Sequence, residues 1–92
     1  MKISILLPYK QNYNHKEAGA VSLFVNQITN KSKYKNSTTI YGNTNSKDTL
    51  SKNYINVKLN KNILKSSTKI YVENFLGIKN ILNSNIIEIH NR

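Results

Sequence analysis

The stretch "LLPYKQNYNHKEAGAVSLFVNQI", from Leu6 to Ile28, passes from a strand pattern through a polar loop into a helix pattern. Leu6 and Leu7 belong to an apolar run that ends at Pro8, a residue that cannot donate to a β-ladder. After Ala18, apolar side chains recur with the 3.6-residue period of a helix. The apolar face of this helix is predicted to contain Val21, Phe24, Val25 and Ile28. A buried strand followed by such a helix is typical of a parallel sheet with crossover connections.

The rest of the chain repeats this alternation of strands and helices. The first strand, residues 2–8, is apolar almost without interruption, which indicates burial on both faces in the middle of a sheet. The third strand, residues 53–59, alternates apolar and polar residues, which indicates a position near a sheet edge. Two further strands are predicted at residues 37–41 and 85–89.

The first helix is predicted from Ala18 to about Ser32, and the second from Ser66 or Ser67 to about Asn83. Gly77 costs about 1 kcal/mol relative to alanine inside the second helix, so a break there is open. The apolar face of the second helix is predicted to contain Tyr71, Phe75, Ile78 and Leu82. The predicted order is therefore β-α-β-β-α-β in a single α/β domain.

The composition describes a small domain with an excess of positive charge. The chain has 92 residues, no cysteine and a formal net charge of +10, so disulfides and thiolate metal sites are excluded. The charge comes almost entirely from scattered lysines, accompanied by much asparagine, isoleucine and tyrosine. Because these four residues share A/T-rich codons, we interpret the lysines as solvated surface in preference to a nucleic-acid footprint. The apolar run at residues 3–7 is too short for a signal peptide or a membrane span, which predicts a cytoplasmic protein.

Two segments are predicted to meet outside the carboxyl ends of the strands, where α/β proteins bind ligands. One is the loop from Tyr9 to Gly19, and the other is the tail His90–Arg92. Gly19 lies at the predicted helix N-terminus, where unsatisfied N–H groups and the helix dipole favour an anion. The alternative is that Gly19 only makes a tight turn. His90 offers an imidazole for acid–base chemistry or hydrogen bonding, or else it is a surface histidine at a chain end.

Metal and nucleophile chemistry find no support in the residue pattern. The few acidic residues are Glu17, Asp48, Glu73 and Glu88, and they show no metal-ligand spacing. Two histidines in the whole chain make a zinc site improbable. Glycine-rich phosphate loops and G-x-S-x-G are also missing from the sequence. We therefore expect neither a metal nor a cofactor.

The two ends of the chain resemble one known family. The segment "MKISILLPYKQNYNHKEAGAVSLFVNQI" resembles the amino-terminal start of family 4 glycosyltransferases, which are retaining enzymes of the GT-B fold, and "NIIEIHNR" resembles a later strand of the same domain. The resemblance covers essentially the whole chain and is weakest between Asn43 and Ser67. It implies that residues 1–92 are a partial, Rossmann-like amino-terminal domain on the acceptor side of the enzyme. The carboxyl-terminal domain that binds the donor would be missing, so the fragment would be inactive alone.

The resemblance also implies roles for three residues. Ala18 and Gly19, where the family usually has a Gly-Gly pair, would line the cleft and approach the donor phosphates or the transferred sugar. His90 would face the same cleft as a catalytic residue. The implied partners are a nucleotide-sugar donor and a sugar or glycan acceptor; nucleic acid is not expected, and a peripheral membrane contact is left open.

The alternative function is a small basic α/β module that binds nucleic acid or another polyanion. In that case the lysines would neutralise phosphates, and Tyr34, Tyr41 and Tyr54 would stack on bases.

Overall fold

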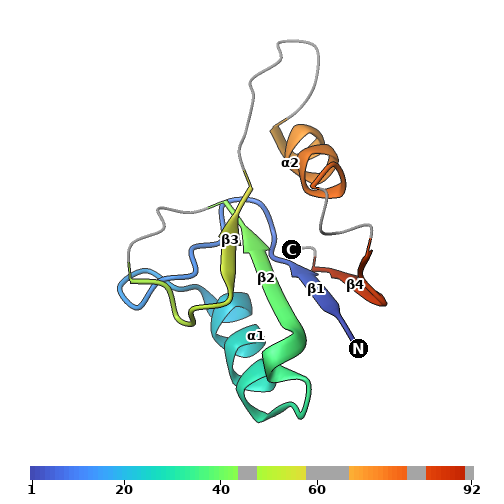
Figure 1. The fold of residues 1–92 in the computed structure, drawn as a ribbon. Coiled ribbons are helices and arrows are strands. Elements are labelled where there is room, and N and C mark those ends of the chain that lie inside the picture. Colours follow the sequence, from blue (N-terminus) through green and yellow to red (C-terminus); the bar gives the residue numbers. More distant parts are fainter. Residues whose placement is uncertain (44–47, 58–66, 79–82, 91–92) are drawn as a thin grey trace.

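The computed structural model describes residues 1–43, 48–57, 67–78 and 83–90 (Figure 1). In chain order its elements are β1 (Ile3–Leu6), α1 (Ala20–Lys31), the 3-10 turn η1 (Lys35–Ser37), β2 (Thr38–Gly42), β3 (Tyr54–Asn56), α2 (Ser67–Leu76) and β4 (Ile86–Ile89). The four strands form one sheet in the order β3-β2-β1-β4, and every neighbouring pair is parallel. The predicted α/β fold with a parallel sheet is therefore confirmed.

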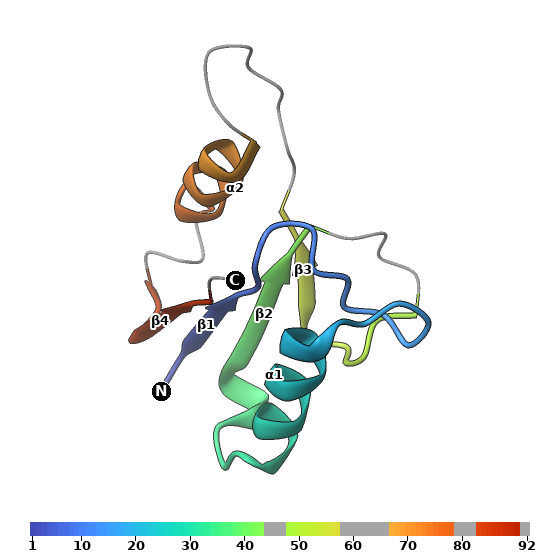
Figure 2. The same cartoon turned by 180° about the vertical axis from the view of Figure 1, so that it is seen from behind.

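The two helices lie on opposite faces of the sheet (Figures 1 and 2). Connections between parallel strands are almost always right-handed. The step from β1 to β2 crosses the sheet in one direction, and the step from β3 to β4 crosses it in the other. Because both crossovers are right-handed but run in opposite directions across the sheet, α1 and α2 must cover different faces. The direction in which successive strands are added reverses between β1 and β4, which are neighbours in the sheet.

The central strand β1 is buried on both of its faces. It pairs with β2 on one side and with β4 on the other. Ile5 and Leu7 belong to the core on the α1 side, and Leu6 belongs to the core on the α2 side. Each of these three side chains is at most 3% exposed. This confirms the prediction of a strand in the middle of the sheet.

Helix α1 turns a different face to the sheet from the one predicted. Its buried residues are Ser22, Val25 and Thr29, while Phe24 is 56% exposed and Ile28 is 40% exposed. The prediction was therefore right for Val25 and for the partly buried Val21, which packs against the same core, and wrong for Phe24 and Ile28. The reason is that the bulk of the core on this side comes from outside the helix.

The core under α1 contains a loop tyrosine in addition to strand residues. It consists of Ile5, Leu7, Tyr13, Val25 and Ile40, with Ile3, Val21, Leu50 and Tyr54 packed against it. Because Tyr13 and its neighbours fill this layer, the side chains of α1 that face it are mostly small. Leu23, Phe24 and Ile28 of α1 are left exposed.

Helix α2 buries the face that the sequence predicts. Tyr71 and Phe75 are fully buried, and Ile78 packs against the same core. The rings of Phe75 and Tyr41 meet edge to face at a centroid distance of 5.2 Å. The helix ends at Leu76, directly before the glycine at which a break was left open. Leu82 of the predicted face lies outside the described residues.

The edges of the sheet are β3 and β4, which confirms the edge position predicted for the third strand. All four residues of β4 are exposed. Residues in parallel register share a face, so Ile86 and Glu88 lie on the α1 side and Ile87 and Ile89 lie on the α2 side. Neither helix, over the ranges given above, has the length and hydropathy needed to cross a bilayer.

Candidate functional site

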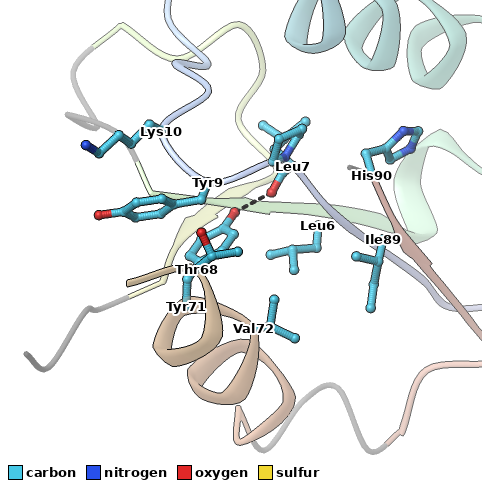
Figure 3. Close-up of a pocket in the computed structure, with 10 residues that line it drawn as sticks. Leu6, Leu7, Tyr9, Lys10, Thr68, Tyr71, Val72, Ile89 and His90 are labelled. Atoms are coloured by element: carbon cyan, nitrogen blue, oxygen red, sulfur yellow. Dashed lines mark hydrogen bonds between the residues drawn. The ribbon is translucent and has the colours of Figure 1, made fainter. Parts of the chain in front are cut away.

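A cavity of about 410 Å³ opens at the carboxyl ends of β1 and β4, on the side of the sheet that α2 covers (Figure 3). Its walls come from the chain that follows β1, from the first turns of α2 and from the end of β4. The residues that line it are Leu6, Leu7, Pro8, Tyr9, Lys10, Thr68, Tyr71, Val72, Ile89 and His90. Its volume is in the range of small-molecule sites.

Tyr9 and Lys10 reach the cavity from a tight turn. The N–H of Gln11 donates to the carbonyl oxygen of Pro8 at 3.1 Å, which closes a four-residue turn. Lys10 has a φ of 66°, the left-handed backbone found at the third position of a type II turn, where glycine is usual. A lysine in that conformation costs about 1 kcal/mol or more. Its Nζ lies 5.6 Å from the centroid of the Tyr9 ring, so a cation–π contact keeps the ammonium beside an aromatic wall.

Tyr71 fixes the wall that α2 contributes. Its hydroxyl donates to the carbonyl oxygen of Leu7 at 2.6 Å, which satisfies a buried backbone group where the chain leaves the sheet. The Tyr71 ring is tilted against that of Tyr9 at a centroid distance of 5.5 Å. Burial is the main cause that raises the pKa of Tyr71 above its ordinary value, and the phenolate charge of Tyr54 is the lesser one. The hydroxyl is therefore a neutral structural donor at physiological pH.

His90 lies at the rim of the cavity, with its ring turned to the α1 side and away from Thr68 and Tyr71 (Figure 3). The backbone N–H of His90 donates to the Leu6 carbonyl oxygen at 3.0 Å and so extends the pairing of β4 with β1 by one residue. Nε2 lies 3.5 Å from Oε1 of Glu88, but the geometry makes no hydrogen bond. Within the described parts of the chain this buried nitrogen has no hydrogen-bond partner. The pair attracts only when the imidazole is protonated.

Ala18 and Gly19 are not among the residues that line this cavity. Gly19 is the N-cap of α1 with φ −81° and ψ 177°, an extended conformation that any residue can adopt. A Cβ at Gly19 would collide with Oε1 of Gln11. The Gln11 carboxamide therefore lies against the start of the helix, where the sequence predicts the approach of an anion. Asn91 and Arg92 lie outside the described residues.

The middle of the polar loop is fixed to the rest of the fold through Tyr13. Tyr13 is fully buried; its hydroxyl donates to Oδ1 of Asn26 at 3.1 Å and lies 2.8 Å from Oγ of Ser51. Its ring stacks on that of Tyr54 at a centroid distance of 5.4 Å. The N–H of Leu50 donates to the Tyr13 carbonyl oxygen at 3.0 Å. Hydrogen bonds of Tyr13 therefore attach this loop to the connection between β2 and β3.

The two segments predicted to form the site are brought together only in part. The start of the loop, at Tyr9 and Lys10, shares a cavity with His90, whereas its end, at Ala18 and Gly19, does not. Sequence reasoning missed Thr68, and it included Tyr9 and Lys10 only as part of the loop, without singling them out as binding residues. The signal for Tyr9 and Lys10 was their position directly after Pro8, at the carboxyl end of the central strand.

The lining combines an aromatic face, an ammonium and a hydroxyl over an apolar floor. Such a surface suits a ligand rich in hydroxyl or anionic groups. In the parts of the chain that are described, histidine and acidic residues form no cluster of three or more that could hold a metal ion. Comparisons of the chain with known protein families, curated proteins and solved structures found no match.

Proposed function

We propose that this chain is the acceptor-side part of a family 4 glycosyltransferase of the GT-B fold, and that its cavity receives the sugar or glycan acceptor. The observation that carries the proposal is the position of the cavity. It opens at the carboxyl ends of β1 and β4, where the sheet reverses its order. Doubly wound α/β proteins bind ligands at that point, and β3-β2-β1-β4 is the order of the first four strands of one such sheet.

The chemistry of the lining supports an acceptor with a sugar ring. The half-buried Tyr9 presents an aromatic face on which the apolar side of a pyranose can stack. The Lys10 ammonium and the Thr68 hydroxyl can bind hydroxyl or phosphate oxygens at the edge of that ring. His90 lies at the rim of the same cavity, but its ring is turned to the α1 side, so the proposal assigns the acceptor contacts to Tyr9, Lys10 and Thr68.

The polyanion alternative has less support in the structure. Tyr41 is 1% exposed and packs on Phe75, and Tyr54 stacks on the buried Tyr13. The Tyr41 ring therefore offers no open platform to a base, and one face of the Tyr54 ring is already covered. Of the three tyrosines considered for stacking, Tyr34 alone stands outside the two cores of the described chain.

The proposal is tested by titrating the ¹⁵N-labelled chain with a panel of monosaccharides, sugar phosphates and glycans. We expect amide shifts at Tyr9, Lys10 and His90. Tyr9→Ala should weaken binding about tenfold, as expected for one lost aromatic contact. Tyr34→Ala is the matched control, because Tyr34 also has a lysine over its ring, with Lys33 Nζ 5.2 Å from the centroid. It should leave acceptor binding unchanged.

The same samples are then incubated with nucleotide-sugars. We expect no transfer by this chain alone, because transfer needs donor and acceptor held together across a closed cleft. Turnover clearly above a blank would contradict the proposal that this chain supplies only the acceptor side of the enzyme. An absence of sugar-induced shifts, together with shifts caused by oligonucleotides at physiological salt, would replace the proposal with the polyanion alternative.

A further inference from the structure

We infer that a second cavity, at the opposite edge of the sheet from the first, binds a small phosphate monoester. This cavity has a volume of about 400 Å³. Its walls come from Asn30 near the end of α1, from Lys35 and Asn36 in η1, and from residues 50–53, which lead into β3. Because the strands are parallel, the amino ends of β2 and β3 lie at the edge opposite the candidate site. The two cavities share no residue, so this inference does not rest on the proposed acceptor site.

The wall that leads into β3 is held in place by the fold. The carbonyl oxygen of Asn53 accepts from the N–H of Ile40 at 2.9 Å, and Nδ2 of Asn53 donates to the carbonyl oxygen of Thr38 at 2.7 Å. The Ser51 hydroxyl donates to Oδ1 of Asn53, and Leu50 packs against the core under α1. This side of the cavity is therefore preformed, which lowers the entropy cost of binding a ligand.

The charge around this cavity is positive and has no acidic counterpart. Lys35 and Lys52 line it from two different segments, and both are exposed. Neither ammonium forms an ion pair with an acid in the described parts of the chain. The sequence contains no acidic residue between Glu17 and Asp48 or between Asp48 and Glu73, and Asp48 is not among the lining residues. Two lysines from separate segments therefore act on one cavity whose lining carries no negative charge.

An anion with several oxygen atoms matches this lining. Ammonium groups donate strong hydrogen bonds to phosphate oxygens, and the carboxamides of Asn30 and Asn36 add neutral donors. The carboxyl end of α1 opposes an anion with a partial charge of about half a unit, which two full positive charges outweigh.

The volume and the remaining lining indicate what the phosphate is attached to. Inorganic phosphate alone would leave much of a cavity of about 400 Å³ unused. Leu50 offers an apolar contact to a short carbon chain, and the carboxamides can also accept hydrogen bonds from hydroxyl groups. The cavity therefore suits the phosphate monoester of a small polyol.

The test is a titration of the ¹⁵N-labelled chain with glycerol phosphate, and with glycerol and inorganic phosphate as separate probes. We expect glycerol phosphate to shift the amide signals of Asn36, Ser51 and Lys52. Inorganic phosphate should bind more weakly, and glycerol should cause no shifts. Added salt should weaken the binding, because it screens the attraction between the charges. These signals are separate from those of Tyr9 and Lys10, which report on the first cavity, so the two proposals can fail independently.

Substitution of single lysines distinguishes a local site from the general attraction of a basic chain. Lys35→Gln and Lys52→Gln should each weaken the binding of glycerol phosphate about three- to fivefold, as expected for one exposed charge pair. Lys33→Gln is the matched control. It removes the same charge from an exposed lysine that lies over the Tyr34 ring and does not line the cavity, so it should leave the affinity nearly unchanged. Thermal melts followed by circular dichroism check that the three variants fold.

Three results would overturn the inference. The first is no shift at Asn36, Ser51 or Lys52 with millimolar glycerol phosphate. The second is an equal loss of affinity in Lys33→Gln, Lys35→Gln and Lys52→Gln, because binding would then follow net charge alone. The third is that inorganic phosphate binds as tightly as glycerol phosphate, because the cavity would then hold a free anion and not a monoester.

Discussion

Strands β1 and β4 are neighbours with similar sequences, ISIL and IIEI, yet one is buried and the other exposed. Leu6 is 1% exposed, whereas its register partner Ile89 is 46% exposed. The difference lies in their surroundings. β1 has a strand on each side and a core on each face, while β4 pairs only with β1 among the strands of the described sheet. Apolar composition therefore makes a strand suitable for burial, but its neighbours decide whether it is buried.

The largest expected effect comes from truncating the two register partners separately. Leu6→Ala should lower the free energy of unfolding by about 2–5 kcal/mol, because it truncates a fully buried side chain of the core under α2. Ile89→Ala should cost less than about 1 kcal/mol, because solvent already reaches that side chain. Urea denaturation of both variants measures the contrast. Equal losses would show that β4 is covered in solution and would remove the distinction between the strands.

A smaller effect is expected from adding an atom to the core beside β1 than from removing a side chain from it. A Cβ on Gly42, in β2, would lie 2.9 Å from Oη of Tyr54 and 3.4 Å from Cδ1 of Leu7. The Tyr54 ring is held by its stack on Tyr13, so it cannot simply swing away. Gly42→Ala should therefore cost about 1–3 kcal/mol. Gly77→Ala, in a position with no side-chain contact closer than ordinary packing, is the control; a neutral Gly42→Ala would mean that this layer is looser than the structure indicates.

The smallest effect concerns the Tyr71 hydroxyl, which donates to the Leu7 carbonyl oxygen just after β1. Because folding raises the pKa of Tyr71, the stability that its neutral form contributes is fully present below about pH 10, the usual pKa of an unfolded tyrosine. Above that pH the unfolded chain loses the proton first, and stability should fall by up to about 1.4 kcal/mol per pH unit. Tyr71→Phe should cost about 1 kcal/mol at neutral pH through the lost hydrogen bond to Leu7.

The measurement is a series of urea titrations from pH 8 to about pH 11. Tyr71→Phe should show a shallower alkaline loss of stability than the unaltered chain. Parallel losses in the two proteins would show that this hydroxyl does not contribute to the alkaline sensitivity.

The sheet could be predicted from local patterns because its strands are marked by them. The apolar run before Pro8 predicted a central strand, and the period of Tyr71 and Phe75 predicted the buried face of α2; both are confirmed. The buried face of α1 could not be predicted in this way. Its orientation depends on Tyr13, a residue in a polar loop whose burial arises from partners far along the chain, such as Ser51.

The site was predictable at the level of the sheet edge and not at the level of side chains. The rule about carboxyl ends placed His90 and the start of the loop correctly at one cavity. It could not show that the His90 ring faces the α1 side, because that depends on the pairing register with β1. Nor could it show that the Gln11 side chain covers the start of α1 at Gly19, because a side-chain contact across a loop leaves no periodic signal.

The register of β1 with its two neighbours also carries a consequence for the order of folding. Ile3 pairs with Thr38 in β2 and with Ile86 in β4, so the second pairing closes a much longer loop. Distant pairings cost more entropy and form later. We therefore expect β1, α1 and β2 to assemble first, which leaves one edge of β1 without its partner until β4 arrives. During that interval a short apolar strand presents open hydrogen-bonding groups to other chains, and strand addition between molecules competes with the closing of the sheet.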